Sequence, residues 1–407
     1  MTGAAGRPLR VAVLTESYLP YLSGVTVSTE ALARGLGAAG HDVLLLAPRP
    51  APGAEPGAAG ASGPDPSLAW LPSFEVPGPA PAGYRVPWPV PSAALRKAAA
   101  FRPDVVHAQS PFVSGLMARR LARRVGAPLV FTHHTRFGDY RHYLGPLAAP
   151  GAALLAGYLL AYWSGCAAVV TPGSELAAEL RGRLGRRMRP VVRTIPTGVE
   201  VATIRTLPAL DPRPLAGWPA DALVVATLGR LAPEKSQELL LEAFARAAQR
   251  EPRLRLLMIG GGPSEGSLRA RAAASDLSAR VHLTGQRPRP AALALLRGAD
   301  LFAVASRTET QGLVLAEALA AGLPVVALDG PGVNDAVRNG IDGLVVAADP
   351  AGDRAARLAR ALERLAADPA TRAAMAGAAF AGADRFSVEA AIGTMVELYR
   401  ELLAGRR

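Results

Sequence analysis

Cysteine, lysine and aromatic residues are scarce in this sequence of 407 residues. A single cysteine, Cys166, excludes an internal disulfide framework and is typical of a reducing compartment. Aromatic residues make up 5% of the chain, and neither a zinc-finger spacing nor an aromatic-basic RNA-binding signature occurs. We therefore predict that nucleic acid is not a partner. No long apolar run precedes Glu16, which predicts no secretory signal.

Lysine occurs only at Lys97 and Lys235, so arginine provides 43 of the 45 basic residues, and the formal net charge is +12. A strongly basic surface attracts nucleic acid or an anionic membrane. Because no nucleic-acid module is present, two interpretations of the charge remain. One is contact with a membrane surface, and the other is the arginine-rich composition of a GC-rich genome.

Metal and dinucleotide signatures are also missing. No Asp-x-Asp occurs, and the histidines and the cysteine show no metal-ligand spacing, so we expect no metal and no other cofactor. Glycines at 35, 37 and 40 have dinucleotide spacing, but they follow a predicted helix and precede a strand, which is the wrong order. The glycines at 260–262 lack the lysine of a phosphate-binding P-loop, and we expect Gly262 to border a nucleotide base instead.

What the chain does contain is an alternation of short β-rich runs with Ala/Leu/Arg-rich helical segments. A length of 407 residues favours two domains, and strand-helix-strand alternation predicts parallel sheets covered by helices on both faces. We predict an α/β protein with two Rossmann-like, doubly wound domains facing across a cleft. The expected domains are 1–198 and 199–384, with a last helix at 385–407 returning to the first domain. Ligands of such sheets bind at the carboxyl ends of the strands.

Three segments depart from this alternation. The Pro/Gly-rich stretch Arg49–Ser92 predicts a long irregular loop, either mobile or covering a site. No charged residue occurs from Gly145 to Thr171, which predicts a buried helix running into a strand, with docking at a membrane interface as the alternative. Near 114–125, four arginines share one helix face, either as an ordinary solvated surface or as a contact for anionic headgroups. They are Arg119, Arg120, Arg123 and Arg124.

Two motifs follow predicted strands. In the first, Glu309 is expected in a strand-to-helix turn and Glu317 inside the following helix, with Gly312 between them. Glycine permits close approach of the backbone, and a helix N-terminus offers N–H groups to anionic oxygens. In the second motif, Gly229-Arg-Leu-Ala-Pro-Glu-Lys235, Arg230 and Lys235 bring two cations to a helix entrance, which suits a diphosphate.

Together these motifs resemble the donor site of family-4-type retaining glycosyltransferases of the GT-B fold. The resemblance covers almost the whole chain and continues in Pro20-Tyr-Leu-Ser-Gly-Val25, Ile195-Pro-Thr-Gly-Val199 and Glu317-Ala-Leu-Ala-Ala-Gly-Leu-Pro-Val-Val326. It implies transfer of a hexose from a nucleotide diphosphate sugar with retention at the anomeric carbon. The resemblance assigns Arg230 and Lys235 to the diphosphate, Glu309 to hydroxyls of the transferred sugar, and Glu317 to the ribose. The turn residues Thr310, Gln311, Gly312 and Leu313 would line the donor, and Gly24 would approach the diphosphate from the other domain.

The acceptor is indicated by a departure from the common family pattern. Many members have Glu-Gly-Phe-Gly where this chain has Glu309-Thr-Gln-Gly312, a form that resembles the diacylglycerol glucosyltransferases. The segments His107-Ala-Gln-Ser-Pro-Phe112 and Thr132-His-His-Thr135 are similar to the same branch. The family places a cleft histidine at the position of His134, which makes it a candidate catalytic residue beside Arg230, Lys235 and Glu309. A structural role is the alternative for this histidine.

These observations predict a retaining hexosyltransferase that uses a UDP-glucose-like donor and glycosylates a membrane lipid such as diacylglycerol. The alternatives are a GDP-mannose-dependent mannosyltransferase acting on a phosphoinositide, a glycan or a small metabolite, a sugar-nucleotide epimerase, or a non-catalytic sugar-nucleotide-binding protein. We expect a bacterial cytoplasmic location, peripheral on the inner face of the membrane, without a transmembrane span.

Overall fold

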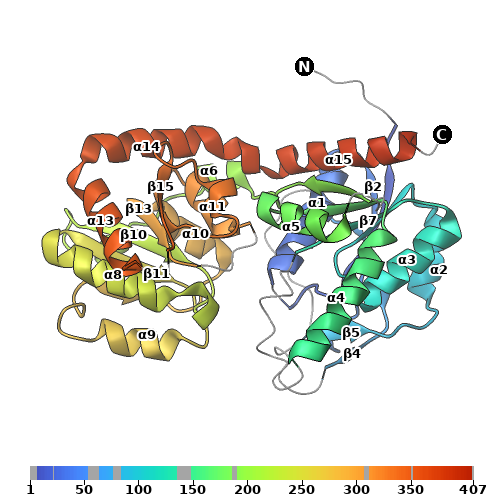
Figure 1. Ribbon diagram of the computed structural model, residues 1–407, viewed down its shortest axis with the longest axis horizontal. Coiled ribbons are helices and arrows are strands. Elements are labelled where there is room, and N and C mark those ends of the chain that lie inside the picture. Colours follow the sequence, from blue (N-terminus) through green and yellow to red (C-terminus); the bar gives the residue numbers. More distant parts are fainter. Residues whose placement is uncertain are drawn as a thin grey trace. The chain divides into compact units, whose positions relative to one another are not determined.

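The computed structural model shows two α/β units, each with its own parallel sheet (Figure 1). It describes residues 7–21, 23–53, 64–76, 84–134, 148–185, 190–306, 311–349 and 352–405. Unit 1 comprises residues 1–198 and 388–407, and unit 2 comprises residues 199–387.

In unit 1, seven strands form a parallel sheet, called sheet 1, in the order β3-β2-β1-β6-β7-β8-β9. The strands are β1 (Arg10–Leu14), β2 (Asp42–Pro48), β3 (Ser67–Leu71), β6 (Val105–Ala108), β7 (Leu129–Thr132), β8 (Ala168–Thr171) and β9 (Val191–Thr194). In the central strand β1, Val13 pairs with Leu45 on one side and with His107 on the other. The last four residues of β1 are fully buried, as expected for a parallel strand covered on both faces.

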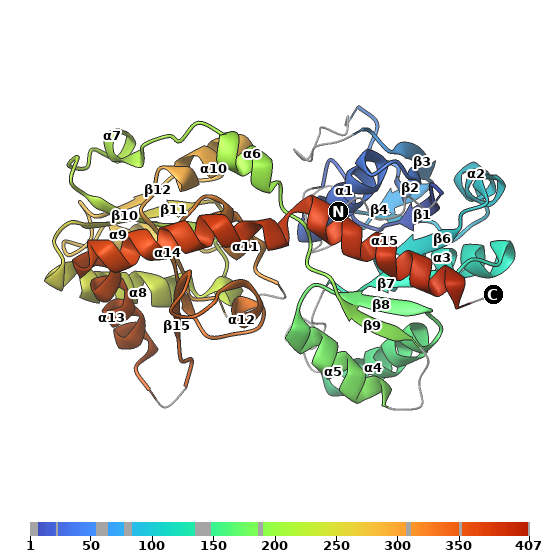
Figure 2. The ribbon, with the colours of Figure 1, turned by 90° about the horizontal axis from the view of Figure 1, so that it is seen from above.

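Helices cover both faces of sheet 1. They are α1 (Gly24–Ala38), α2 (Ala93–Phe101), α3 (Val113–Val125), α4 (Ala148–Ser164), α5 (Ser174–Leu184) and α15 (Val388–Ala404). One core lies beneath α2 to α5, and the other lies beneath α1 and α15, which Figure 2 shows lying across the strands. Side-chain caps begin two of these helices, because Ser23 accepts from the N–H of Thr26 and Ser92 from that of Leu95.

The prediction of an irregular stretch at 49–92 was wrong for part of its length. Residues Ser67–Leu71 form β3, which pairs with β2, and β4 (Ser73–Glu75) and β5 (Arg85–Pro87) form an antiparallel hairpin. Proline and glycine surround these strands and conceal them in the sequence. Residues 54–63 and 77–83 lie outside the described part.

In unit 2, six strands form a second parallel sheet, called sheet 2, in the order β12-β11-β10-β13-β14-β15. The strands are β10 (Leu223–Leu228), β11 (Leu254–Ile259), β12 (Val281–Leu283), β13 (Leu301–Val304), β14 (Val325–Leu328) and β15 (Gly343–Val346). The helices are α6 (Val201–Thr206), α7 (Pro212–Ala216), α8 (Gln237–Arg250), α9 (Glu265–Ala272), α10 (Arg289–Arg297), α11 (Leu313–Ala320), α12 (Val333–Ala336), α13 (Arg354–Ala367) and α14 (Pro369–Gly382), with short 3-10 helices at Pro233–Lys235 and Ala383–Phe386. One core forms between the sheet and α8, α9 and α13, and the other forms against α6, α10, α11 and α12.

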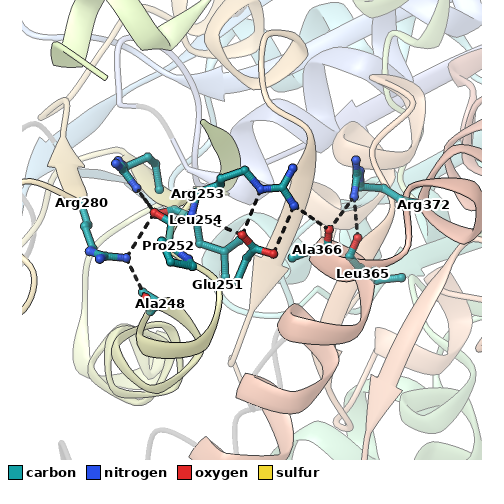
Figure 3. A network of polar contacts seen from close by, with 10 residues as sticks. Ala248, Glu251, Pro252, Arg253, Leu254, Arg280, Leu365, Ala366 and Arg372 are labelled. Atoms are coloured by element: carbon teal, nitrogen blue, oxygen red, sulfur yellow. Dashed lines mark hydrogen bonds and ion pairs between the residues drawn. The ribbon is translucent and has the colours of Figure 1, made fainter. Parts of the chain in front are cut away.

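Arginines at the amino edge of sheet 2 satisfy backbone carbonyls at helix ends and in the neighbouring turn (Figure 3). Arg372 donates to the carbonyls of Leu365 and Ala366 at 2.7 and 3.2 Å, and Arg280 donates to that of Ala248 at 2.7 Å. Arg253 is held by the carboxylate of Glu251, at 3.0 Å from Nε. The last carbonyls of a helix lack intrahelical partners, so part of the arginine content of this chain is structural.

Candidate functional site

The two motifs of unit 2 lie at the carboxyl edge of sheet 2, on either side of its topological switch point. From β10 the chain proceeds outward through β11 and β12, and from β13 it proceeds the other way through β14 and β15. The segment Gly229–Lys235 follows β10, and the segment from Ser306 to Gly312 follows the adjacent strand β13. Ligands of open parallel sheets bind at such a crevice, where the connecting loops diverge.

The loop after β10 carries Arg230 and Lys235. The sequence predicts that these two cations lie at the start of a helix, but a separate short turn precedes the helix in the structure. Pro233–Lys235 forms a 3-10 turn, and α8 begins only at Gln237, after Ser236 with a φ of 51°. The Arg230 side chain is 67% exposed, and its Nη1 lies 3.7 Å from Oε1 of Glu234. The Gln237 side chain donates to the carbonyl of Arg230 at 2.8 Å and fixes the turn. Arg230 is therefore accessible to a ligand.

The glycines after β11 hold this loop in place. Gly262 has a φ of 156°, and a Cβ there would lie 2.3 Å from the carbonyl oxygen of Leu231. The backbone N–H of Leu231 donates to the carbonyl of Gly261 at 3.0 Å, and the N–H of Ser264 donates to that of Leu231 at 3.0 Å. Any side chain at Gly262 would separate the two loops, so this glycine positions the Arg230 turn.

The segment after β13 is described on both sides of a gap. Residues 307–310 lie outside the described part, so the structure says nothing of Glu309 or Thr310. Ser306 is buried, and Gln311 is 7% exposed. Gly312 has a φ of 68° and immediately precedes α11, whose first residue is Leu313. A left-handed residue at this position reverses the chain into the helix, and glycine adopts that conformation without steric cost.

Glu317 lies inside α11, and its side chain is only 3% exposed. Its Oε1 accepts a hydrogen bond from Nη2 of Arg289, the first residue of α10. Burial raises the pKa of Glu317, whereas the charge and the hydrogen bond of Arg289 lower it. The sequence analysis missed Arg289, because a separation of 28 residues between two helices leaves no local signal.

In unit 1, Glu16 and Ser110 meet at the switch point of sheet 1, between β1 and β6. Oε2 of Glu16 accepts from the Ser110 hydroxyl at 2.7 Å, and Oε1 accepts from the backbone N–H of Ser114 in the first turn of α3 at 2.7 Å. Burial raises the pKa of Glu16, and these hydrogen bonds lower it. The sequence analysis missed this carboxylate, although its position directly after the first strand was an available signal.

Gly24 is exposed and begins α1, and a Cβ there would meet no atom within 4 Å. Its neighbour Ser23 belongs to a hydroxyl cluster, with Ser17 Oγ at 2.8 Å and Thr26 Oγ1 at 3.0 Å. Open space at this helix start leaves room for a ligand to approach the backbone. Leu22 lies outside the described residues.

The three histidines of the two lipid-branch segments have different surroundings. His107 is fully buried in β6, where Nδ1 contacts the Tyr399 hydroxyl at 2.6 Å and Nε2 contacts that of Thr132 at 2.7 Å. His133 is buried between the rings of Phe131 and Trp163. Burial lowers the pKa of both histidines to about 3, so both are neutral and structural.

His134 is half-buried at the carboxyl edge of sheet 1, and its Nε2 lies 2.7 Å from Oε1 of Gln109, which follows β6. When Nε2–H donates to this amide oxygen, Nδ1 remains as a hydrogen-bond acceptor. Burial lowers the pKa of His134 to about 4, so the imidazole is neutral at physiological pH. Gln109 is therefore a further site candidate, positioned to set the tautomer of the histidine.

One surface of unit 1 combines apolar and basic side chains, and we call it the α3–α4 face. The Phe112 ring stacks on Tyr158 of α4 at 6.2 Å, and Tyr158 donates to the carbonyl of Pro111 at 2.6 Å. Leu154 lies one helical turn before Tyr158 and is 78% exposed, and Leu116 is 39% exposed. Further along α3, Arg120, Arg123 and Arg124 are exposed, whereas Arg119 is half-buried.

The expectation that the uncharged stretch is a buried helix was therefore wrong for much of α4. Leu159, Tyr162 and Trp163 are buried, but residues 151–158 are half-buried or exposed. Within the described residues, no helix combines the length and the apolar character needed to span a bilayer. Nor do any three His, Cys, Asp or Glu side chains of the described part gather into a potential metal site.

Comparison with known proteins identifies glycosyltransferase families in both halves of the chain. The family described as Glycosyltransferase Family 4 matches residues 22–203, and the family described as Glycosyl transferases group 1 matches residues 213–381. An alpha-monoglucosyldiacylglycerol synthase of Acholeplasma laidlawii is 30% identical over 330 residues, which cover 78% of this chain and 80% of the relative. A D-inositol 3-phosphate glycosyltransferase of Thermobispora bispora is 32% identical over 332 residues, which cover 77% of this chain and 74% of the relative.

Among solved structures, Anabaena Alr3699/HepE in complex with UDP has a TM-score of 0.72 at 18% identity, covering 97% of this chain and 100% of that one. The same protein has also been solved with UDP-glucose, and that structure has a TM-score of 0.67 at 19% identity, covering 97% and 100%. At this identity, the similarity is one of fold.

Proposed function

The chain belongs to the family-4 glycosyltransferases and has the GT-B fold, and on this basis we propose that it transfers a hexose from a UDP-glucose-like donor to the hydroxyl of a membrane lipid such as diacylglycerol. We propose that transfer proceeds with retention at the anomeric carbon. The proposed roles are donor binding by unit 2 and acceptor binding by unit 1.

The donor site is proposed at the switch point of sheet 2. Arg230 and Lys235 would bind the diphosphate and stabilise the charge that develops on it as the glycosidic bond breaks, which is a major source of catalysis in group transfer. The segment Gln311–Leu313 would present backbone N–H groups of α11 to the donor, with Glu309 and Thr310 beside it. Gly262 would lie near the base.

Glu317 is proposed to bind the ribose. As a buried carboxylate held by Arg289, it offers its other oxygen as an acceptor for the two ribose hydroxyls. Arg289 would also keep this carboxylate ionised, since burial alone favours the protonated form.

On the acceptor side, Gly24 and His134 are the proposed contributors. Gly24 would let the first turn of α1 approach the diphosphate. The neutral His134, with its Nε2–H directed to Gln109, would accept at Nδ1 a hydrogen bond from a hydroxyl of the reacting sugar. We identify no enzymic nucleophile, so the acceptor hydroxyl would attack from the face that the diphosphate leaves.

The lipid acceptor is supported by one observation above all, the exposed and uncharged half of α4. Tyr158 of α4 contacts Phe112, the residue that precedes α3, so the first turns of α4 extend past the start of α3. Figure 1 shows these turns of α4 extending away from the sheet. Leu154 is therefore available to enter an apolar phase, and the arginines of α3 can contact anionic headgroups at about 1 kcal/mol each. This arrangement suits a peripheral enzyme on the inner face of the cell membrane.

A phosphorylated inositol acceptor is the second candidate, because a relative named as a D-inositol 3-phosphate glycosyltransferase is as similar to this chain as the lipid enzyme. A GDP-mannose donor likewise remains an alternative to the UDP-glucose-like donor.

The test is product identification from paired donors and acceptors. The enzyme would be incubated with UDP-glucose or GDP-mannose and either diacylglycerol in anionic vesicles or inositol 3-phosphate, and the products identified by mass spectrometry. We expect a monoglucosyl lipid from UDP-glucose, and NMR of the new linkage should give the donor's own α configuration. Turnover with inositol 3-phosphate alone would overturn the lipid assignment, and an inverted linkage would overturn retention.

A further inference from the structure

A groove of unit 1 lies far along α3 from the proposed acceptor site. It has a volume of about 460 Å³, and it separates the last turns of α3 from the turn between α4 and β8. Leu129 begins β7 and Ala167 precedes β8, so the groove is at the amino edge of sheet 1, whereas Gln109 and His134 are at the carboxyl edge. Its volume is within the usual range for ligand pockets, about 300–1,000 Å³.

Two arginines of α3, Arg119 and Arg123, line this groove. Arg119 is half-buried, and its Nε is buried with no hydrogen-bond partner in the described part of the chain. Its guanidinium lies against Gly165, where a Cβ would be only 2.5 Å from Nη2. This differs from Arg253 and Arg372 of unit 2, whose guanidinium groups are used by carbonyls and a carboxylate (Figure 3).

The surroundings of Arg119 do not neutralise its charge. No acidic residue is among those that line the groove, and no described carboxylate forms an ion pair with Arg119. Cys166, Tyr158 and Tyr162 interact electrostatically with Arg119. Burial raises the pKa of the Cys166 thiol to about 12 and that of the Tyr162 hydroxyl well above its usual value, so both are neutral at pH 7. A second cation, Arg123, adds to the positive potential.

We propose that this groove is a binding site for a phosphate group, held by Arg119 and Arg123. A planar guanidinium pairs with phosphate oxygens through two parallel hydrogen bonds, and an uncompensated, half-buried arginine is suited to this pairing. The phosphate belongs either to a phosphorylated metabolite or to the headgroup of a phospholipid. The site goes beyond the proposed transferase reaction and does not depend on the identity of donor or acceptor.

The experiment is calorimetric titration of the full chain with two probes, inorganic phosphate and glycerophosphoglycerol, a water-soluble phosphodiester headgroup. Any binding at the Arg230 loop is common to all variants, so differences between variants report the groove. Arg119→Gln should weaken binding about tenfold or more, because charge-assisted contacts are lost. Arg96→Gln is the matched control, since it removes the same charge at an exposed residue of α2, outside both the groove and the α3–α4 face.

A second variant keeps every charge. In Gly165→Ala, the added methyl group would lie 2.5 Å from Nη2 of Arg119 and displace the flexible guanidinium. We expect weaker phosphate binding at unchanged net charge, which a diffuse electrostatic attraction cannot produce. If Arg119→Gln does not fold, Arg123→Gln tests the same site, because Arg123 also lines the groove and its loss should weaken phosphate binding.

The outcomes separate cleanly. Binding of inorganic phosphate assigns the site to a free phosphate or monoester, and binding of glycerophosphoglycerol alone assigns it to a lipid headgroup. Equal losses in Arg119→Gln and Arg96→Gln, or no measurable binding of either probe by the unaltered protein, would overturn the proposal. Transferase activity is not the readout, so failure here leaves the proposed function untouched.

Discussion

Arg289 donates to the buried carboxylate of Glu317 and so joins the start of α10 to the middle of α11. Burial raises the pKa of Glu317, and the guanidinium opposes this rise. The guanidinium therefore favours the ionised form of this carboxylate, which is the form that we propose binds the ribose hydroxyls.

Arg289→Met should make donor binding dependent on pH. Without the guanidinium, the pKa of Glu317 rises further, and the carboxylate is ionised only above that pKa. Donor affinity should therefore fall as the pH decreases through this raised pKa, which lies above the usual carboxyl range. Calorimetric titration with UDP at several pH values checks this, with Arg287→Met, an exposed neighbour, as the control. A pH-independent affinity in Arg289→Met would contradict the role given to the pair.

Lys235→Ala should lower the rate of sugar transfer about 100-fold or more, as does the removal of one preorganised group that stabilises developing charge. The chain supplies its own control, because Lys97 is the only other lysine and is on α2 in unit 1. Lys97→Ala should retain full activity. Glu309→Gln should be as inactive as Lys235→Ala, with an unaltered melting temperature. Near-normal turnover in either donor-site variant would show that the donor binds elsewhere.

Gln109→Glu should move the acid limb of the activity profile to higher pH. The neutral imidazole of His134 is lost as pH falls through its pKa, which burial holds at about 4. A carboxylate in place of the amide would favour the imidazolium and raise this pKa. The measurement is the pH dependence of kcat/KM, with Gln249→Glu on the exposed side of α8 as the control. An unshifted acid limb would leave His134 with a structural role only.

Vesicle binding should require both parts of the α3–α4 face. Leu154→Asp should reduce flotation with anionic vesicles, and charge reversal at Arg120 and Arg124 should abolish it. Binding should weaken as salt rises from about 0.1 M to about 1 M, because the Debye length shrinks from about 10 Å to about 3 Å. Leu215→Asp changes an exposed leucine of unit 2 and should bind normally. If the unaltered protein fails to float even at low salt, a soluble acceptor becomes the better hypothesis.

Transfer should survive excess chelator. The sequence has no Asp-x-Asp, and Arg230 and Lys235 can supply the positive charge that a divalent ion would bring to the diphosphate. Activity assays with and without chelator test this. Complete loss that magnesium or manganese restores would show that the diphosphate is bound through a metal.

The sequence was sufficient for the fold class and the family, because both depend on features that are local in the chain. Runs such as Val11–Leu14 are long enough to reveal buried parallel strands, and the placement of motifs after β10 and β13 follows from that alternation. The strand β3 was missed because proline and glycine surround it, and the exposure of Leu154 was missed because an uncharged helix was taken to be a buried one.

Only part of the candidate site could be predicted from the sequence. The roles of Arg230, Lys235, Glu309 and Glu317 were inferred from a resemblance to the family and remain predictions. The pairs that now refine them, Arg289 with Glu317 and Gln109 with His134, join different strands or helices. Such contacts depend on the order of strands in the sheet and on side-chain conformation, neither of which has a fixed spacing in the sequence.

The helix α15 has a consequence for biosynthesis. It belongs to unit 1, where Ile392, Leu398 and Tyr399 complete a core and Tyr399 contacts His107, yet it follows unit 2 in the sequence. A ribosome therefore releases all of unit 2 before unit 1 has its full interior. During that interval, the apolar side of α1 has no α15 to cover it, so the nascent chain passes through a stage in which chaperone binding or aggregation competes with completion of the first unit.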